Sequence, residues 1–313
     1  MNRFTKFTLL TAVLLCIIGG ILVTAGIAGN GLNDLADATQ NTSGTLNGTS
    51  KEYRMDKTRL EDITNIQVEL SNMSFQILPS DDDFCYLSYQ TTGGKKNPVS
   101  YEVKDGTLSL KENDRNISFS IGIDYGSLTD MLLGKKSDSD SYDYLAVLYL
   151  PKETILKSAD IHLDYGDVII RGLTADSFDV SLNCGDLNIR ELNADAFDAS
   201  LDYGDATLKD CHLNNGTLKM SDGDTSVTGT LFTGKNIIES SYGDVSVTLD
   251  EEQKDALSLS CSTSYGEINL PKSLQDSASR LTSSDDIQEF EKQGTDISSS
   301  FTVKCADGDI TIQ

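Results

Sequence analysis

The sequence repeats one short motif seven times: a glycine, an acidic residue, and then two apolar or small residues separated by one position. The repeat glycines are Gly166, Gly185, Gly204, Gly223, Gly243, Gly266 and Gly308, which lie 19, 19, 19, 20, 23 and 42 residues apart. A nearly fixed period of this length is typical of repeat proteins, in which each copy buries its apolar residues only by stacking on its neighbours. The sequence therefore predicts a chain of stacked structural units.

Apolar residues alternate with polar ones on both sides of each Gly-acid pair. Aligned copies place like residues at like positions, as with Phe178 and Phe197, or with Ile170, Ile189 and Leu208. Alternation with a period of two is the pattern of β-strands with one buried face, and no copy shows the i, i+3, i+4, i+7 pattern of a helix. These features predict an all-β fold, a parallel β-solenoid (β-helix) with rungs of about 19–20 residues and two strands in each rung.

These patterns divide the chain into four regions, and two of them hold strands. Residues 161–313 hold the regular repeats, with an insertion at about 273–300 that explains the last, long interval. Residues 59–160 hold strand-like alternations separated by turn signals, and form the N-terminal β part of the solenoid. Within the insertion, Ser273 to Lys292 has the pattern of a helical flap. Gln313 directly follows the last motif, so we expect an open strand edge there that another chain can pair with.

The N-terminus predicts a membrane segment. Arg3 and Lys6 precede an uncharged apolar run over residues 7–29, which is long enough to span a bilayer. The positive-inside rule places the repeats outside the membrane. A cleaved signal peptide, with Gly26-Ile27-Ala28 as the cleavage site, is the alternative. Residues 30–58 are rich in Gly, Asn, Ser and Thr and are predicted to be a flexible linker.

Charge and cysteine content limit the function. The formal net charge is −24, which opposes binding of nucleic acid and favours binding of cations or a basic partner. Outside residues 1–29 there are five cysteines and no CxxC motif, so neither a zinc site nor a disulfide framework is predicted. Their pairing is left open: Cys85, Cys184, Cys211, Cys261 and Cys305.

The acidic residues of the motif admit two interpretations. In the first, glycine forms a close-packed corner between strands and the carboxylate accepts backbone N–H groups there. In the second, stacked carboxylates about 4.8 Å apart form a column that binds Ca²⁺, the one cofactor considered. The predicted metal column is Asp167, Asp186, Asp205, Asp224, Asp244 and Glu267.

Tyrosines directly precede four of the repeat glycines. Tyr165, Tyr203, Tyr242 and Tyr265 are candidate binding residues, because a column of exposed rings suits stacking on glycans or contact with a protein. The alternative is that the rings pack over the edge of the core. Catalytic motifs are not recognisable: His162 and His212 lie in different repeats and in no nucleophile or metal-ligand pattern.

Several of these segments resemble a known family. The run from Val147 to Lys152, the run from Ala159 to Ile170, a second Leu-Pro-Lys at 270–272 and the repeated Gly-Asp units resemble the DUF4097 putative adhesin family of bacterial envelope proteins. The resemblance covers residues 60–313 and implies a parallel β-solenoid, often membrane-anchored. It implies no catalytic or binding residues.

The sequence thus favours a membrane-anchored, extracytoplasmic binding module of the bacterial cell envelope that is not an enzyme. The expected location is the cell membrane, with a single span at residues 7–29. A cell-wall polymer or a membrane protein is the expected partner. Two alternatives stay open, an accessory protein of an envelope-stress sensing system and a carbohydrate-active enzyme.

Overall fold

The computed structural model describes residues 51–93, 98–113, 144–283 and 287–313. The predicted membrane segment and residues 30–50 of the predicted linker lie outside these ranges. In the part that is described, no helix is long and apolar enough to cross a bilayer. Residues 51–58 were also assigned to the linker, and this is wrong: they belong to a strand, Lys51–Arg59, because its backbone pairs antiparallel with residues 86–93.

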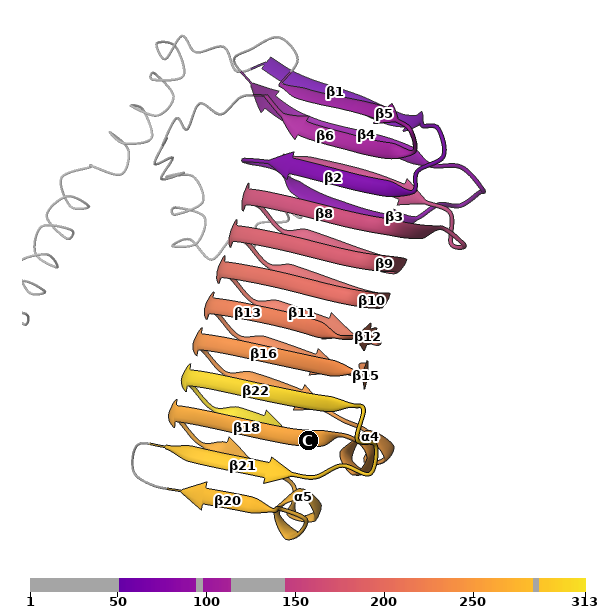
Figure 1. The fold of residues 1–313 in the computed structure, drawn as a ribbon. Coiled ribbons are helices and arrows are strands. Elements are labelled where there is room, and N and C mark those ends of the chain that lie inside the picture. The colour runs from indigo at the N-terminus through magenta and orange to yellow at the C-terminus, as the bar shows by residue number, and fades with distance from the viewer. Residues whose placement is uncertain (1–50, 94–97, 114–143, 284–286) are drawn as a thin grey trace, which may run out of the picture. The chain divides into compact units, whose positions relative to one another are not determined.

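The N-terminal part contains eight described strands. They are β1 (Lys51–Arg59), β2 (Asn65–Leu70), β3 (Ser74–Pro79), β4 (Tyr86–Gly93), β5 (Val99–Lys104), β6 (Thr107–Glu112), β7 (Leu145–Leu150) and β8 (Ile155–Tyr165). Strands β2 and β3 do not lie at the end of the stack, although they come early in the chain. β2 pairs in parallel with both β6 and β8, and β3 pairs in parallel with both β7 and β9 (Figure 1).

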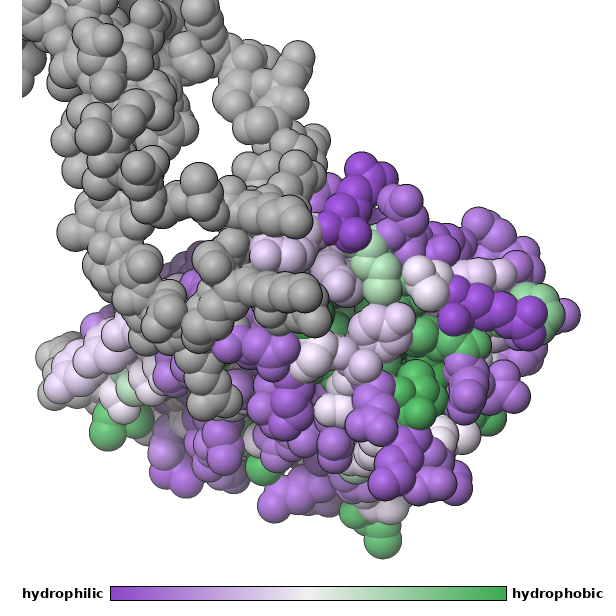
Figure 2. All heavy atoms as spheres, turned by 90° about the horizontal axis from the view of Figure 1, so that it is seen from above, coloured by the Kyte–Doolittle hydropathy of each residue, from purple (hydrophilic) through white to green (hydrophobic). Residues whose placement is uncertain are grey.

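Antiparallel strands close this end. β5 pairs with β6, and the β4 strand lies between β1 and β7. Lys57 of β1 lies over the rings of Tyr86 and Tyr149, and a lysine on an edge strand discourages pairing with other chains. Seen from this end, the surface left in view is mostly hydrophilic, and its hydrophobic residues form small, separate groups (Figure 2).

The middle of the stack is regular. It consists of β9 (Val168–Cys184), β10 (Leu187–Tyr203), β11 (Ala206–Lys209), β12 (His212–Asn214), β13 (Gly216–Asp222), β14 (Thr225–Thr228), β15 (Leu231–Thr233), β16 (Lys235–Tyr242) and β17 (Val245–Thr248). β9 and β10 pair in parallel and in register over their whole length, from Val168 opposite Leu187 to Cys184 opposite Tyr203. The 19-residue period therefore equals one rung.

The two rungs from β11 to β16 have three strands each, where two were predicted, whereas β9 and β10 are each one continuous strand of 17 residues. One example is β11 after the Gly-Asp corner, β12 on a third side, and the longer β13, which leads to the next corner. The third strand is only three residues long, which is too short for an alternating pattern to reveal. The predicted ladders are confirmed: the rings of Phe178 and Phe197 stack 5.9 Å apart and 6° from parallel, and both are buried.

The C-terminal part departs from chain order. It contains α4 (Glu251–Ala256), β18 (Ser258–Tyr265), β19 (Ile268–Asn269), α5 (Lys272–Asp276), β20 (Arg280–Ser283), β21 (Gln288–Lys292), β22 (Ser300–Asp307) and β23 (Ile310–Ile312). The last rung, β22 and β23, lies between its two predecessors. β22 pairs with β16 and β18, and β23 pairs with β17 and β19, so the yellow β22 separates two orange strands (Figure 1).

Two sequence predictions about this end are therefore wrong. The edge at Gln313 is not open, because its backbone N–H donates to the carbonyl of Val247 and its carbonyl accepts from Leu249. Most of Ser273 to Lys292 is not helical. Among its described residues only those of α5 are helical, while β20 and β21 form antiparallel strands, and β21 pairs with β18 on the outer side of the stack.

A short helix ends the third side of the stack. Helix α4 takes the place of a further third strand after β15, and Asp250 caps it by accepting the backbone N–H of Gln253 at 2.7 Å. The buried side chain of Gln253 then replaces the missing strand. Its amide donates to the carbonyl of Thr230 and accepts the N–H of Phe232, both at 2.8 Å.

Candidate functional site

The seven repeat glycines form one continuous column along a corner of the stack. A Cβ placed on Gly204 would lie 2.1 Å from the carbonyl oxygen of Gly185, and one on Gly185 would lie 2.1 Å from that of Gly166. Gly204 also has a φ of +138°, which strains any L side chain. Only glycine fits, so the corner interpretation of the motif is confirmed.

The acidic residues that follow form a ladder of hydrogen bonds. The backbone N–H of each acid after Asp167 donates to the carboxylate Oδ1 of the acid on the neighbouring rung, at 2.8 to 3.0 Å, and that of Asp167 donates to Ser74 Oγ at 3.1 Å. The spatial order, from acceptor to donor, is Asp167, Asp186, Asp205, Asp224, Asp244, Asp309 and Glu267. One carboxylate oxygen of each aspartate therefore satisfies the backbone at an exposed corner, where the chain turns and offers no strand partner.

The structure places the predicted metal column in register, with Asp309 inserted between Asp244 and Glu267. Each Asp Oδ1 is committed to a backbone N–H. Over the described ranges, no three side chains of His, Cys, Asp or Glu converge as ligands of one metal ion would. Calcium binding by Asp167, Asp186, Asp205, Asp224, Asp244 and Glu267 stays a prediction.

The predicted tyrosines lie beside this ladder, on alternate rungs. Their column reads Tyr165, Cys184, Tyr203, Asp222, Tyr242, Asp307 and Tyr265 in spatial order. The exposed fractions of the four tyrosines are 45%, 61%, 60% and 67% in that order. The rings therefore do not pack into the core, and successive rings are about 10 Å apart, twice the spacing of adjacent strands.

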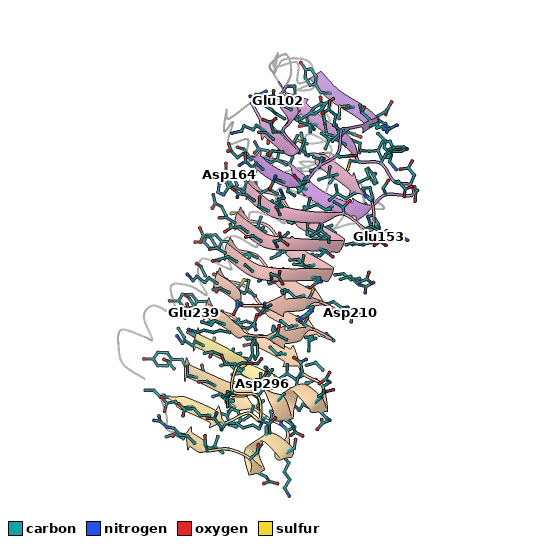
Figure 3. All side chains as sticks on the ribbon, turned by 45° about the vertical axis from the view of Figure 1, so that its right-hand side comes forward. Glu102, Glu153, Asp164, Asp210, Glu239 and Asp296 are labelled. Carbon is teal, nitrogen blue, oxygen red and sulfur yellow. The ribbon has the colours of Figure 1, made fainter. Side chains whose placement is uncertain are left out.

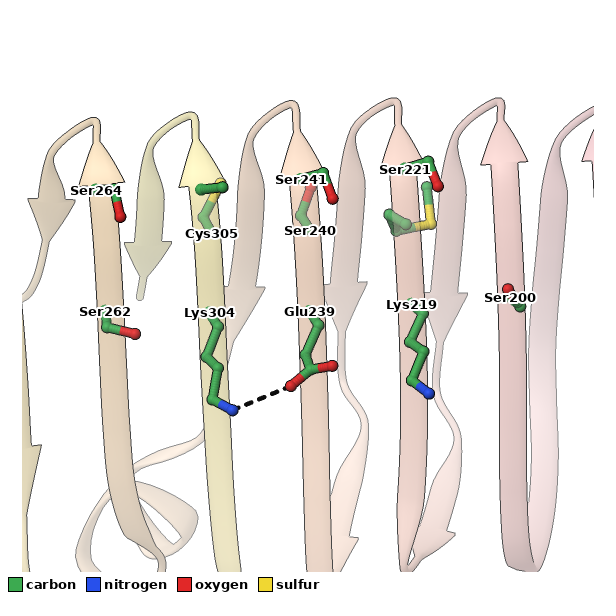
Figure 4. A pocket seen from close by; sticks show the side chains of 12 residues that line it. Ser200, Lys219, Ser221, Glu239, Ser240, Ser241, Ser262, Ser264, Lys304 and Cys305 are labelled. Atoms are coloured by element: carbon green, nitrogen blue, oxygen red, sulfur yellow. Dashed lines mark hydrogen bonds and ion pairs between the residues drawn. The ribbon is translucent and has the colours of Figure 1, made fainter.

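A shallow groove of about 520 Å³ lies next to the tyrosine edge. It crosses the strands of five rungs, β10, β13, β16, β22 and β18 (Figure 4). Its lining is rich in hydroxyl groups and contains one ion pair, in which Lys304 Nζ lies 3.0 Å from Glu239 Oε1. The serines in the lining are Ser200, Ser221, Ser240, Ser241, Ser262 and Ser264.

Three of these serines, Ser221, Ser241 and Ser264, lie two residues before the repeat glycine in their copies of the motif. The sequence predicted no groove here. The signal was present in the period-two alternation, which places every second residue before the corner on the outer face. The alternation does not reveal the order of the rungs. β22 lies between β16 and β18, which belong to consecutive copies in the sequence, and it contributes Lys304 to the groove.

The N-terminal half of the same outer face is acidic. Asp160, Asp179 and Asp198 stack on three successive rungs. Desolvation by the neighbouring rungs, followed by the charges of Asp198 and Asp160, raises the pKa of Asp179.

On the same side, His162 Nε2 lies 3.6 Å from Asp164. Asp164 and Glu239 lie at one side of the stack, and Asp210 lies at the other (Figure 3).

The five described cysteines are all free thiols. Four are buried, and burial raises the pKa of Cys261 to about 12. A thiol that stays protonated at neutral pH is a poor nucleophile and a poor metal ligand. Cys184 is the exception, since it is half-buried and occupies a rung of the tyrosine column. The buried thiols therefore act as small apolar side chains of the core.

No curated protein matches the chain. Solved structures that match include one described as a putative cell adhesion protein from Clostridium sporogenes, at 13% identity, a TM-score of 0.33, and coverage of 84% of this chain and 99% of the other. A putative adhesin from Bacteroides fragilis matches at 13% identity, a TM-score of 0.40, and coverage of 85% and 99%. A putative lipid binding protein from Parabacteroides distasonis matches at 13% identity, a TM-score of 0.31, and coverage of 85% and 98%.

A family model matches residues 63–313, almost the whole described stack. The resemblance drawn from the Gly-Asp units is thereby confirmed. The chain belongs to the DUF4097 family, whose domain is called Toastrack.

Proposed function

We propose that this protein is a non-catalytic binding module of the bacterial cell envelope. It is held in the membrane by residues 7–29 and binds an extended wall glycan outside the cell, along the tyrosine edge and the adjoining groove. The observation that carries the proposal is the exposure of Tyr203, Tyr242 and Tyr265 at 60% or more on alternate rungs. Large exposed rings in a regular row mark an interaction surface.

The chemistry of this surface suits a sugar polymer. An aromatic ring offers a flat apolar face for a sugar ring, and the phenolic hydroxyl can also form hydrogen bonds. The spacing of about 10 Å between rings is comparable to two sugar units of an extended chain. The serine hydroxyls, Lys304 and Glu239 in the groove supply donors and acceptors for sugar hydroxyls.

The surface also favours binding over catalysis. The groove is open, and its one described carboxylate, Glu239, is already paired with Lys304. Hydrolysis of a glycan by the usual mechanism needs two carboxyl groups that face each other across the bond. A binding role is also in line with the descriptions of two matching solved structures, a putative adhesin and a putative lipid binding protein.

The test is sedimentation of the purified full-length chain, in a non-ionic detergent, with isolated cell-wall glycan. The Tyr203→Ala/Tyr242→Ala double variant should reduce the bound fraction at least tenfold, as expected when two aromatic contacts of about 1 kcal/mol or more are removed. Tyr101→Ala is the control, since Tyr101 is also exposed but lies on β5, far from this edge in the strand order. Equal binding by all three proteins would refute the proposal.

Exchange of the anchor separates this role from the stress-sensing alternative. Replacing residues 7–29 by an unrelated membrane span should leave glycan binding unchanged, because the binding edge lies wholly within the stack. A sensor that contacts its partner through the anchor should lose function.

A further inference from the structure

A second charged surface lies on a different side of the rung. It consists of Arg171, Arg190 and Lys209, which we call the basic ladder. The three residues occupy the same position on successive rungs, directly opposite one another. All three are exposed. Asp210, which follows Lys209, lies at the other side of the stack from Asp164 (Figure 3).

The basic ladder is unusual for this chain. Asp and Glu outnumber Lys and Arg by 49 to 25, so a cation usually has an acid within reach. Elsewhere the stack pairs unlike charges across rungs, as in Lys111 with Glu69 at 2.8 Å and Lys304 with Glu239 at 3.0 Å. Among the described residues, no member of the basic ladder forms an ion pair.

Like charges placed directly opposite one another on neighbouring strands destabilise a sheet. A column of three cations without counter-charges therefore lowers the stability of the stack unless an anion binds between them. Glu191 and Asp210 are the nearest carboxylates in sequence. Both have positive φ, Glu191 within β10 and Asp210 just after β11, and among the described residues neither forms an ion pair with the ladder.

The ladder lines a groove of about 300 Å³ that has no carboxylate in its wall. Asn188 and Thr207 contribute polar groups to it, on the two rungs of Arg190 and Lys209. Arginine presents a planar set of N–H donors that matches two oxygens of one phosphate, and lysine adds a point charge. Cations about 4.8 Å apart suit an anion that carries several phosphates in a row.

We propose that the basic ladder is a binding site for a linear ligand with successive phosphate groups. Arg190 is the central contact, with Arg171 and Lys209 on either side. This site is independent of the glycan edge, so the protein holds two kinds of envelope component on two sides of the same rungs. The phosphate groups can belong to a free polyphosphate or to a phosphodiester polymer, and the chemistry recognised is the same.

The test is calorimetric titration of the full-length chain with tripolyphosphate and with inorganic phosphate at low salt. Tripolyphosphate should bind at least tenfold more tightly, because it meets all three cations. Arg190→Gln should lose at least tenfold in affinity for tripolyphosphate. The slope of log K against log salt should be about −2 and should become shallower by about 0.7 for each cation removed.

Controls separate this site from general attraction of anions. Lys235→Gln removes an exposed lysine of β16 outside the ladder and should leave affinity unchanged. Arg190→Gln should fold with an unchanged or higher Tm, because it relieves repulsion. Equal affinity of Arg190→Gln and the parent chain would overturn the site. Equally tight binding of a polyuronate with the same charge would overturn the assignment to phosphate.

Discussion

Two rungs lie one position inside the ends of the stack. One is formed by β2 and β3, near the start of the described chain, and the other by β22 and β23, the last strands in sequence. At the N-terminal end, β6 and β7 lie outside β2 and β3. At the C-terminal end, β18 and β19 lie outside β22 and β23. Antiparallel strands cover both outer rungs, β5 and β4 at one end and β21 at the other. The rungs from β9 to β17 instead follow one another in chain order.

This difference shows that the repeats form the middle of the stack, whereas antiparallel strands cover its two ends. A stacked rung leaves a row of unpaired N–H and C=O groups on its open side, which invites pairing with another chain. Antiparallel strands satisfy those groups and end the parallel series. Because β22 and β23 lie between two other rungs, they are paired on both sides.

The strongest way to break the comparison is to delete one rung from each region. Removing residues 186–204 joins Gly185 to Asp205 and preserves the 19-residue phase, so the chain should still fold, with a Tm lower by less than about 10 °C. Removing residues 300–313 leaves both β16 and β18 without a parallel partner on one side, and cooperative unfolding should disappear or the Tm should fall by more than about 20 °C. Thermal unfolding followed by circular dichroism measures both. Equal losses would mean that the ends are not special.

The glycine column is common to the middle and the ends, and it should give the next largest effect. Gly204→Ala places a Cβ 2.1 Å from a backbone oxygen and should cost about 3 kcal/mol or more. Gly172→Ala is the matched control, because Gly172 also has positive φ, +64°, but nothing lies within 4 Å of its added Cβ. It should cost only about 1 kcal/mol. Denaturant titration compares the two, and similar costs would refute the role of close packing.

Gln253 tests how the third side of the stack ends. Gln253→Ala leaves the carbonyl of Thr230 and the N–H of Phe232 unpaired in a buried site and should cost about 2 kcal/mol. Gln275→Ala is the control, since its amide donates only to the exposed carbonyl of Leu270, and it should change stability by less than about 0.5 kcal/mol. Hydrogen exchange should locate the loss at β15. A loss spread evenly over all rungs would contradict this role.

Asp179 should give the smallest effect, of opposite sign. Its pKa is raised in the folded state, so the folded protein holds the proton more tightly than the unfolded chain. Stability therefore falls as the pH rises from the ordinary Asp pKa through the raised one. Asp179→Asn should raise the Tm at neutral pH by less than about 4 °C, and the gain should vanish at a pH below the ordinary Asp pKa. A gain that persists in acid would contradict the explanation.

The candidate site was accessible from the sequence to different degrees. Alignment of the repeats reveals the acids, the tyrosines and the serines Ser221, Ser241 and Ser264. One repeat period corresponds to one rung, so equivalent residues form columns. The alternation of tyrosines with other residues is visible in the sequence from Tyr165 to Tyr242 but is lost after that. In the sequence, Tyr242 and Tyr265 belong to consecutive copies, and only the insertion of β22 places Asp307 between them. The unpaired state of the basic ladder also depends on side-chain contacts that spacing does not show.

By itself, the sequence determined the rung: its period, its buried ladders, its glycine corner and the family to which the chain belongs. These are local properties, since a close-packed corner needs glycine and a buried strand face needs alternation wherever the rung lies. Only the tertiary structure decided the order of the rungs and the closure of the ends. Every copy presents the same corner and the same apolar ladder, so any rung fits on any other, and the repeat pattern cannot distinguish between neighbours. The order follows from satisfying the backbone at both ends, which is a property of the whole stack.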